Sequence, residues 1–188
     1  MEVSDMQDKI SILPPGSDDL IFAPGLSGER SPFWKSYWKG GLVGLSRNHG
    51  KAHLFRALME GICYRERNLL AIMKKQGVKM DKVTVTGGCS EIDIWNQIRA
   101  DVTGMIVVRT KNKQATVSGI ALFCKMAQEK AGFTKIEETD WFAESTRYVP
   151  DPEKSSIYDR YSDIFRNHLY RCDRTYRELT TKYFRDGE

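Results

Sequence analysis

The chain has 188 residues, of which 40% are hydrophobic and 29% are charged, and this composition is typical of a globular protein with a sizeable core. Its net charge of +4 at pH 7 would suit an anionic ligand but is too small to indicate a nucleic-acid binder. It contains neither a signal-peptide pattern, nor an apolar run of the about 18 residues that span a membrane, nor a CxxC pair. We therefore expect a cytoplasmic protein that does not bind membranes.

The first third of the chain alternates short strands with a loop. Residues 1–19 form a polar lead that ends in a turn-rich stretch, and residues 20–23 form a short apolar strand. The glycine-containing stretch 25–40 lacks periodicity and predicts an ordered surface loop. Its two tryptophans, Trp34 and Trp38, either carry a binding role or pin the loop onto the core.

A second short strand over residues 41–45 leads into a long helix. The apolar stripe predicts this helix from about His49 to Gln76, and Gly77 is a suitable terminator. His49 and His53 lie one helical turn apart, which is a spacing that could bind zinc. No third ligand is evident nearby, so we favour hydrogen bonds at the helix start for both.

The centre of the chain has the order strand, glycine pair, helix, strand, helix. The strand 83–86 ends in Gly87-Gly88, and a helix with its buried face over residues 94–102 follows. A strand over 105–109 and an apolar helical pattern over 115–126 complete this unit, which predicts a parallel sheet with crossover helices. A glycine pair between a strand and a helix lets a phosphate approach the backbone, although most such turns only reverse the chain.

The last part of the chain is predicted to be irregular and then helical. Residues 130–152 are acidic and aperiodic, whereas residues 153–185 carry an apolar stripe close to a heptad repeat. The other faces of this helix are basic and could contact nucleic acid. We expect instead that the segment 151–188 packs on its own domain with a solvated charged side.

Several ordered motifs together resemble the FGGY family of carbohydrate kinases, in the later part of its C-terminal domain. Gly40-x-Leu42-x-Gly44-Leu45, followed after seven residues by His53-Leu54-x-x-Ala57-Leu58-Met59-Glu60, fits a family signature at every restricted position. The stretches FAPGLSGERSPFW (22–34), TGGCSEIDIWNQIRADVTG (86–104) and QATVSGIAL (114–122) are also similar. A closing Tyr148-x-Pro150-x-Pro152-Glu153 is similar to the xylulokinase-like members.

The resemblance implies an α/β protein with the actin-like, ribonuclease H-like ATPase fold, present here as part of the C-terminal domain over residues 20–150. Members transfer the γ-phosphoryl group of ATP to a sugar or polyol hydroxyl with Mg²⁺, and an aspartate accepts the hydroxyl proton. That aspartate, the sugar-binding residues and a Gly-Thr phosphate loop all precede this region in the family. We therefore assign no catalytic residue, leave Asp18, Asp19 and Asp101 without that role, and expect the fragment to be inactive alone.

The resemblance also implies a nucleotide site. Gly87, Gly88, Cys89 and Ser90 are the residues expected to contact ATP or ADP, near the α-phosphate or ribose. The chain departs from the usual family residues at four positions, namely Cys89 for glycine, Ile92 for serine, Lys35 for aspartate and Gln114 for glutamate.

Three further positions are interpreted with the resemblance in view. Gly119 is expected at a helix-packing position. Glu29 and Arg30 are either cleft residues or a salt bridge within their loop.

Two functions and two kinds of partner follow from the family interpretation. The chain is either the nucleotide-binding portion of a sugar kinase or a non-catalytic nucleotide-binding or assembly module of the same fold. Its carbohydrate substrate would bind only with the N-terminal domain, which this sequence does not include, and nucleic acid is not an expected partner. Unpaired sheet edges predict a homo-oligomer, with Ile21–Phe22 and the 41–45 strand as the candidate exposed surface. The N-terminal half is the alternative partner.

Overall fold

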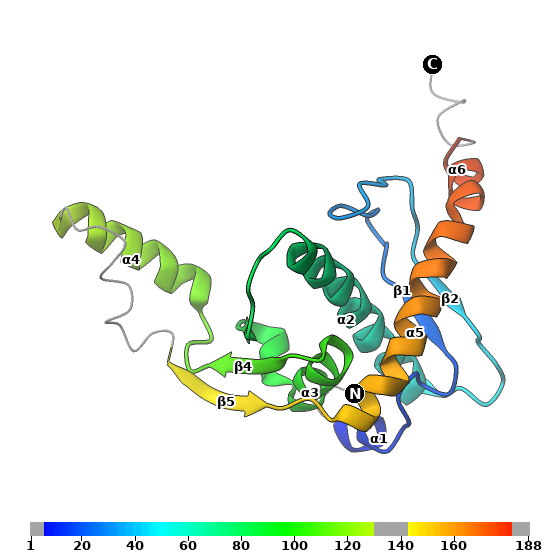
Figure 1. The fold of residues 1–188 in the computed structure, drawn as a ribbon, viewed down its shortest axis with the longest axis horizontal. Coiled ribbons are helices and arrows are strands. Elements are labelled where there is room, and N and C mark those ends of the chain that lie inside the picture. Colours follow the sequence, from blue (N-terminus) through cyan, green and yellow to red (C-terminus); the bar gives the residue numbers. More distant parts are fainter. Residues whose placement is uncertain (1–5, 130–142, 182–188) are drawn as a thin grey trace.

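The computed structural model describes residues 6–129 and 143–181 (Figure 1). Its helices are α1 (Gln7–Ser11), α2 (Lys51–Lys75), α3 (Asp93–Thr103), α4 (Ala115–Glu129), α5 (Pro152–Arg171), α6 (Asp173–Thr181) and the short 3₁₀-helix η2 (Gly88–Glu91). Its strands are β1 (Ile21–Ala23), β2 (Gly41–Val43), β3 (Lys82–Val85), β4 (Ile106–Thr110) and β5 (Glu144–Tyr148).

The strands form two sheets. β1 pairs with β2 antiparallel, whereas the other sheet has the order β3-β4-β5. β3 and β4 are parallel, with Val83 opposite Val107, and α3 connects them; this confirms the predicted crossover unit. β5 pairs antiparallel with β4, so the prediction of irregular structure was wrong for residues 144–148. Only Tyr148 of this strand is buried, so β5 has no apolar pattern of its own. The strand forms because the edge of β4 is available for pairing.

The core lies where α2, α3 and α5 meet β1 (Figure 1). Its main buried side chains are Met6, Ile10, Ile21, Met59, Cys63, Tyr64, Ile98, Val102, Tyr158, Phe165 and Leu169. Trp38 belongs to this core and pins its loop, whereas Trp34 is 75% exposed. Because Met6 and Ile10 are buried, the described part of the polar lead packs with the domain through α1.

The described part of the C-terminal segment, residues 151–181, forms two helices rather than the one predicted, and α5 packs on the domain. Asp151 caps α5 by accepting from the backbone N–H groups of Glu153 and Lys154, and Pro152 occupies the first turn. α5 ends at Arg171, and α6 begins again after Cys172. Residues 182–185 of the predicted helix lie outside the described residues.

Asp173, at the start of α6, ties this helix to the loop that carries Trp38. Its Oδ1 accepts from the Tyr37 hydroxyl at 2.6 Å and from Trp38 Nε1 at 2.7 Å, and its Oδ2 pairs with Arg177 Nε at 2.8 Å. Hydrogen bonds from Tyr37, Trp38 and Arg177 lower the pKa of the Asp173 carboxyl below its ordinary value.

Acid is therefore expected to loosen α6 from the loop. Because the folded-state pKa of Asp173 is lowered, its stabilisation is complete above the unfolded-state value of about 3.9 and is lost as the pH falls through the folded-state pKa. Tryptophan fluorescence, followed from about pH 5 to about pH 1, should show a transition that Asp173→Asn lacks. The same acid transition in both proteins would contradict this assignment.

α4 stands beside the sheet and away from α2 and α5 (Figure 1). The apolar pattern over residues 115–126 predicts one buried face that includes Leu122, Phe123 and Met126. Leu122 and Met126 are buried, but Phe123 is 58% exposed, so the prediction was wrong for Phe123. Gly119 also does not pack as expected against the described residues, because a Cβ built there would meet none of their atoms within 4 Å.

The exposed strand surface differs from the expected one. Ile21 is buried, so its predicted exposure was wrong, whereas Leu42, Val43 and Leu45 are exposed. Within residues 6–129 and 143–181, no helix has the length and apolar character needed to span a membrane.

Candidate functional site

The Gly-Gly turn lies at the carboxyl end of β3 and is open to solvent. Gly87 has φ +86° and ψ −175°, a backbone conformation that is essentially restricted to glycine. Gly88 opens η2 and is exposed, and a Cβ on either glycine would meet no atom within 4 Å. The turn is therefore not buried in helix packing, and its backbone can be approached from outside.

Ser90 fixes the shape of this turn from the inside. Its backbone N–H and its hydroxyl both donate to the Gly87 carbonyl, at 3.1 and 2.7 Å. Its own carbonyl accepts from Asn96 Nδ2 of α3 at 2.7 Å and from an Arg109 guanidinium nitrogen of β4 at 3.3 Å. Since Asn96 is fully buried, the turn is anchored to the core. Cys89, in contrast, is exposed.

Arg109 links the turn to the rest of the sheet. The guanidinium also donates to Asp93 Oδ1 at 2.8 Å and to Thr146 Oγ1 of β5 at 3.0 Å. Asp93 in addition accepts from the Tyr148 hydroxyl at 2.6 Å, and burial together with this hydrogen bond raises the pKa of Tyr148. The acidic groups nearest the turn are thus already paired, and Glu91 pairs with Lys113.

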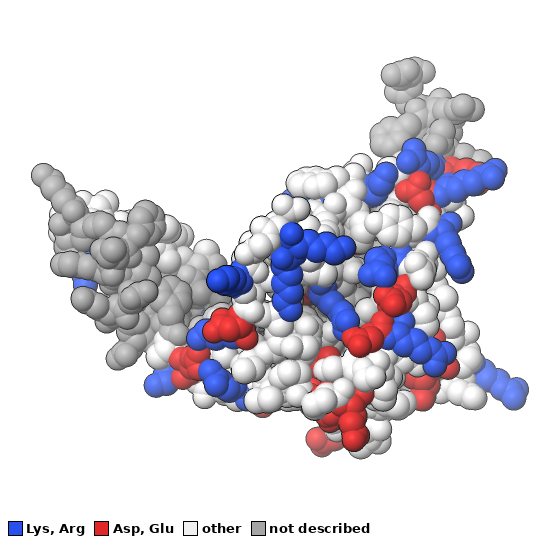
Figure 2. All heavy atoms as spheres, viewed as in Figure 1, with Lys and Arg blue, Asp and Glu red and all other residues white. Residues whose placement is uncertain are grey.

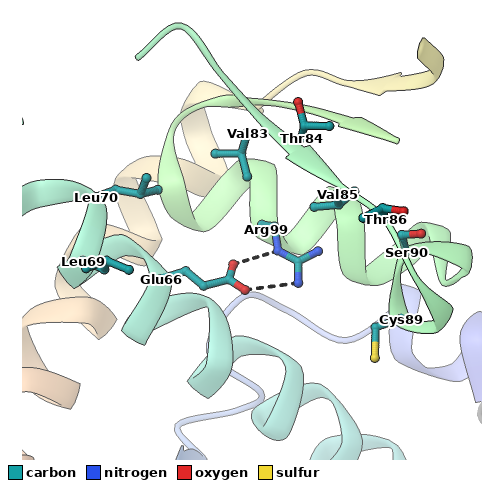
Figure 3. A pocket seen from close by; sticks show the side chains of 10 residues that line it. All are labelled: Glu66, Leu69, Leu70, Val83, Thr84, Val85, Thr86, Cys89, Ser90 and Arg99. Atoms are coloured by element: carbon teal, nitrogen blue, oxygen red, sulfur yellow. Dashed lines mark hydrogen bonds and ion pairs between the residues drawn. The ribbon is translucent and has the colours of Figure 1, made fainter. Parts of the chain in front are cut away.

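A hollow of about 380 Å³ runs along β3 toward the turn (Figure 3). Val83 and Val85 line it from the strand, and Leu69 and Leu70 line it from α2. At its base, the Arg99 guanidinium donates to both carboxylate oxygens of Glu66, at 2.7 and 3.3 Å. In the described part of the chain, β3 has a strand neighbour on one side only. The hollow therefore follows an open strand edge, and its walls are apolar above the ion pair at its base.

The structure distinguishes the two interpretations of Glu29 and Arg30. Glu29 is buried and pairs with Arg65 of α2 at 2.9 Å, whereas Arg30 is exposed. Burial raises the pKa of Glu29, and Arg65 opposes that shift. Glu29 thus forms a salt bridge from the loop to α2 rather than with its neighbour.

His49 and His53 make the predicted hydrogen bonds at the start of α2. The Nδ1 atoms accept from the N–H groups of Ser46 and Gly50, at 3.0 and 3.1 Å. The Nε2 atom of His49 lies 3.0 Å from the Asp18 carbonyl oxygen, and that of His53 lies 3.0 Å from the Asp18 carboxylate. Across the described ranges, no group of three or more histidine, cysteine or acidic side chains could hold a metal ion.

The other two aspartates set aside as catalytic bases have structural partners. Asp19 Oδ1 accepts from the Tyr161 hydroxyl at 2.7 Å, and Asp101 Oδ1 accepts from Gln97 and from the Asp151 N–H. These contacts hold α5 against the domain.

Sequence reasoning missed Asn96 and Arg109 as supports of the turn. An arginine in a strand that is mostly apolar is an unusual feature and was the available signal.

Residues 5–128 match the sequence model of the C-terminal domain of the FGGY family of carbohydrate kinases. The chain therefore belongs to this family, and its mixed α/β fold, shared with solved FGGY kinases, is the actin-like ATPase fold predicted from the sequence motifs.

Particular glycerol and xylulose kinases are similar to it in sequence or in structure. It is 33% identical over 128 residues to glycerol kinase 2 of Sulfolobus acidocaldarius, covering 68% of this chain and 26% of that protein. It is 27% identical over 160 residues to the xylulose kinase of Bacillus subtilis, covering 84% and 32%. The ligand-bound xylulose kinase of Lactobacillus acidophilus superposes with a TM-score of 0.82 at 25% identity, over 95% of this chain and 36% of that one. The chain spans about a third of the length of these relatives.

Proposed function

We propose that this chain is the C-terminal nucleotide-binding portion of an ATP-dependent sugar or polyol kinase, xylulokinase-like and inactive by itself. The observation that carries the proposal is the open Gly87-Gly88 turn at the end of β3, within the stretch that matches the family. A strand followed by a glycine turn and a helix offers a backbone that an anionic phosphate can approach closely.

The proposed nucleotide contacts are Gly87, Gly88, Cys89 and Ser90, near the α-phosphate or ribose. Gly87 and Gly88 would let the phosphate approach the backbone, because no side chain covers them. The Ser90 hydroxyl already donates to the Gly87 carbonyl, so its part is to hold the turn and to accept, through its oxygen lone pairs, from a ribose hydroxyl. A Plasmodium falciparum glycerol kinase solved with ADP has a similar fold, with a TM-score of 0.71, and supports a nucleotide as ligand.

Mg²⁺ belongs to the proposed complete enzyme rather than to this portion. Among the described residues, the carboxylates beside the turn are engaged by Arg109, Tyr148 and Lys113, and they do not fit a metal site. We propose that the ion arrives with the nucleotide phosphates. Asp18, Asp19 and Asp101 have structural partners, so we place the proton-accepting group in the remainder of the kinase.

We propose the N-terminal half of the kinase as the partner of the open β3 edge. An added strand would satisfy the backbone groups of β3 and cover Leu69, Leu70, Val83 and Val85. The exposed side chains of Leu42, Val43 and Leu45 are the proposed surface for self-association. The four cysteines form no disulfide, which supports the cytoplasmic compartment that we propose.

Nucleotide titration tests the site, and Gly77 provides a matched control. Gly87 and Gly77 have nearly equal positive φ values, +86° and +84°, and neither has an atom within 4 Å of a built Cβ. Alanine at either position should strain the backbone by about 1–3 kcal/mol. Only Gly87→Ala should also weaken ADP binding, by about tenfold in isothermal titration calorimetry, because the strained turn moves away from the phosphate.

Kinase assays on xylulose and glycerol complete the test. The chain alone should give no turnover, and turnover should require the N-terminal half of a xylulose kinase. Turnover by the chain alone would place a catalytic base within it, contrary to the proposal. Nucleotide binding that never leads to turnover with the N-terminal half would favour the non-catalytic module, and equal ADP affinity in both alanine variants would remove the turn from the site.

A further inference from the structure

A second hollow lies between α2 and α5, which we call the α2–α5 hollow. It has a volume of about 340 Å³. Asn68, Ile72 and Lys75 line it from one stripe of α2, because these residues are spaced by four and three positions. Arg166 and Tyr170 line it from one stripe of α5. It shares no lining residue with the hollow along β3, so its ligand need not be the nucleotide.

The charged side chains that line this hollow are both cations. Lys75 makes no ion pair with another described residue, and Arg166 pairs only with Asp163 of its own helix, at 2.6 Å and half-exposed. Figure 2 shows Lys and Arg side chains gathered over the C-terminal end of α2 and over α5 on the same face. A compact anion would therefore meet two positive side chains from two different helices.

Asn68 adds a polar group that the protein itself does not satisfy. The residue is only 9% exposed, and its Nδ2 has no hydrogen-bond partner among the described residues. A buried amide nitrogen without a partner costs free energy, and an acceptor oxygen in the hollow would remove that cost once the shielded amide turns toward it. The amide therefore favours a ligand that brings oxygen acceptors to the α2 wall.

The remaining wall is aromatic and held in place. Phe33, from the loop after β1, contacts Tyr170 edge-on with ring centroids 5.8 Å apart, and Tyr170 contacts Trp38 in the same way at 6.1 Å. Because Trp38 is buried in the core, the Tyr170 ring is supported from behind. Such a surface suits the carbon face of a small organic group better than a bare inorganic ion.

We propose that the α2–α5 hollow binds a small phosphate ester. The phosphoryl oxygens lie between Lys75, Arg166 and the Asn68 amide, and the carbon portion lies against Phe33 and Tyr170. This assignment is independent of the proposed nucleotide site, because the two regions have different residues and different wall chemistry.

Calorimetric titration with glycerol 3-phosphate and xylulose 5-phosphate at low ionic strength tests the proposal, with inorganic phosphate and the unphosphorylated sugars as comparisons. The two phosphate esters should bind, and free glycerol and free xylulose should not. Lys75→Gln and Arg166→Gln should each weaken binding by about tenfold. Lys74→Gln and Arg160→Gln remove the same charge from the same helices outside the lining and should leave the affinity within about twofold.

Two further arms locate the ligand within the hollow. Tyr170→Leu should weaken the sugar phosphate but not inorganic phosphate, because it removes only the aromatic wall. Saturating ADP should leave the affinity unchanged.

Four outcomes would overturn the proposal. The first two are no binding by the unmodified chain and an equal loss of affinity in all four charge variants. The other two are competition by ADP, and an equal loss of affinity for the phosphate esters and for inorganic phosphate in Tyr170→Leu. Circular dichroism of each variant separates these outcomes from loss of the fold.

Discussion

Replacement of Glu60 by alanine is expected to lower the free energy of unfolding by about 3–5 kcal/mol, since it would leave the buried Arg56 without its partner. The Glu60 carboxylate is 1% exposed and accepts four hydrogen bonds. The donors are Arg56 Nε at 2.8 Å, the Tyr158 hydroxyl at 2.7 Å, the Ser17 hydroxyl at 2.9 Å and the Gly16 N–H at 3.1 Å. One side chain of α2 therefore joins α5 to the turn before β1.

Urea denaturation of matched variants separates this network from an ordinary ion pair. Tyr158→Phe removes one donor and should cost about 1–2 kcal/mol. Glu178→Ala removes an exposed pair of the same spacing, with Arg174 at 2.8 Å, and should lower the free energy of unfolding far less than Glu60→Ala does. Similar losses for Glu60→Ala and Glu178→Ala would show that burial of the network contributes nothing.

Alanine at Gly61 is expected to have the second largest effect, a loss of about 2 kcal/mol or more in unfolding free energy. A Cβ at Gly61 would lie 2.1 Å from the Phe22 carbonyl oxygen, so α2 and β1 would have to separate. Helix propensity alone would favour alanine over glycine by about 1 kcal/mol, and the clash must exceed that gain.

Gly119→Ala is the matched control for this prediction. Gly119 also lies inside a helix, but a Cβ there would meet no atom of the described residues within 4 Å. Its replacement should therefore stabilise the protein by up to about 1 kcal/mol. Thermal denaturation monitored by circular dichroism should show shifts of opposite sign, and a gain of stability in Gly61→Ala would contradict the close approach of α2 and β1.

The long helices and the parallel strands could be predicted because their signals are local. The apolar stripe and Gly77 placed the helix at His49–Gln76, and the structure has it at Lys51–Lys75. The apolar, β-branched runs of β3 and β4 and the intervening helix were likewise sufficient for the crossover. The glycine pair indicated the turn for the same reason, because its sequence neighbours define it.

What escaped prediction depends on contacts between distant residues. β5 forms because β4 offers a free edge, and the sequence of residues 144–148 contains little sign of it. Trp34 and Trp38 belong to the same loop pattern, yet only Trp38 meets Asp173, which is 135 positions away. Arg109 and Asn96 hold the turn from two different elements, so no single motif includes both.

The one-sided pairing of β3 also has a kinetic consequence. The strand that precedes β3 in the sequence is β2, which is connected to it through α2 and lies in the other sheet. No described neighbour in sequence can therefore supply a strand on the open side of β3. Any strand there closes a very long loop or comes from another polypeptide, and such distant pairings form slowly. The helices and strands described above rest on contacts already within the chain, so they can assemble first and offer that edge as a ready template.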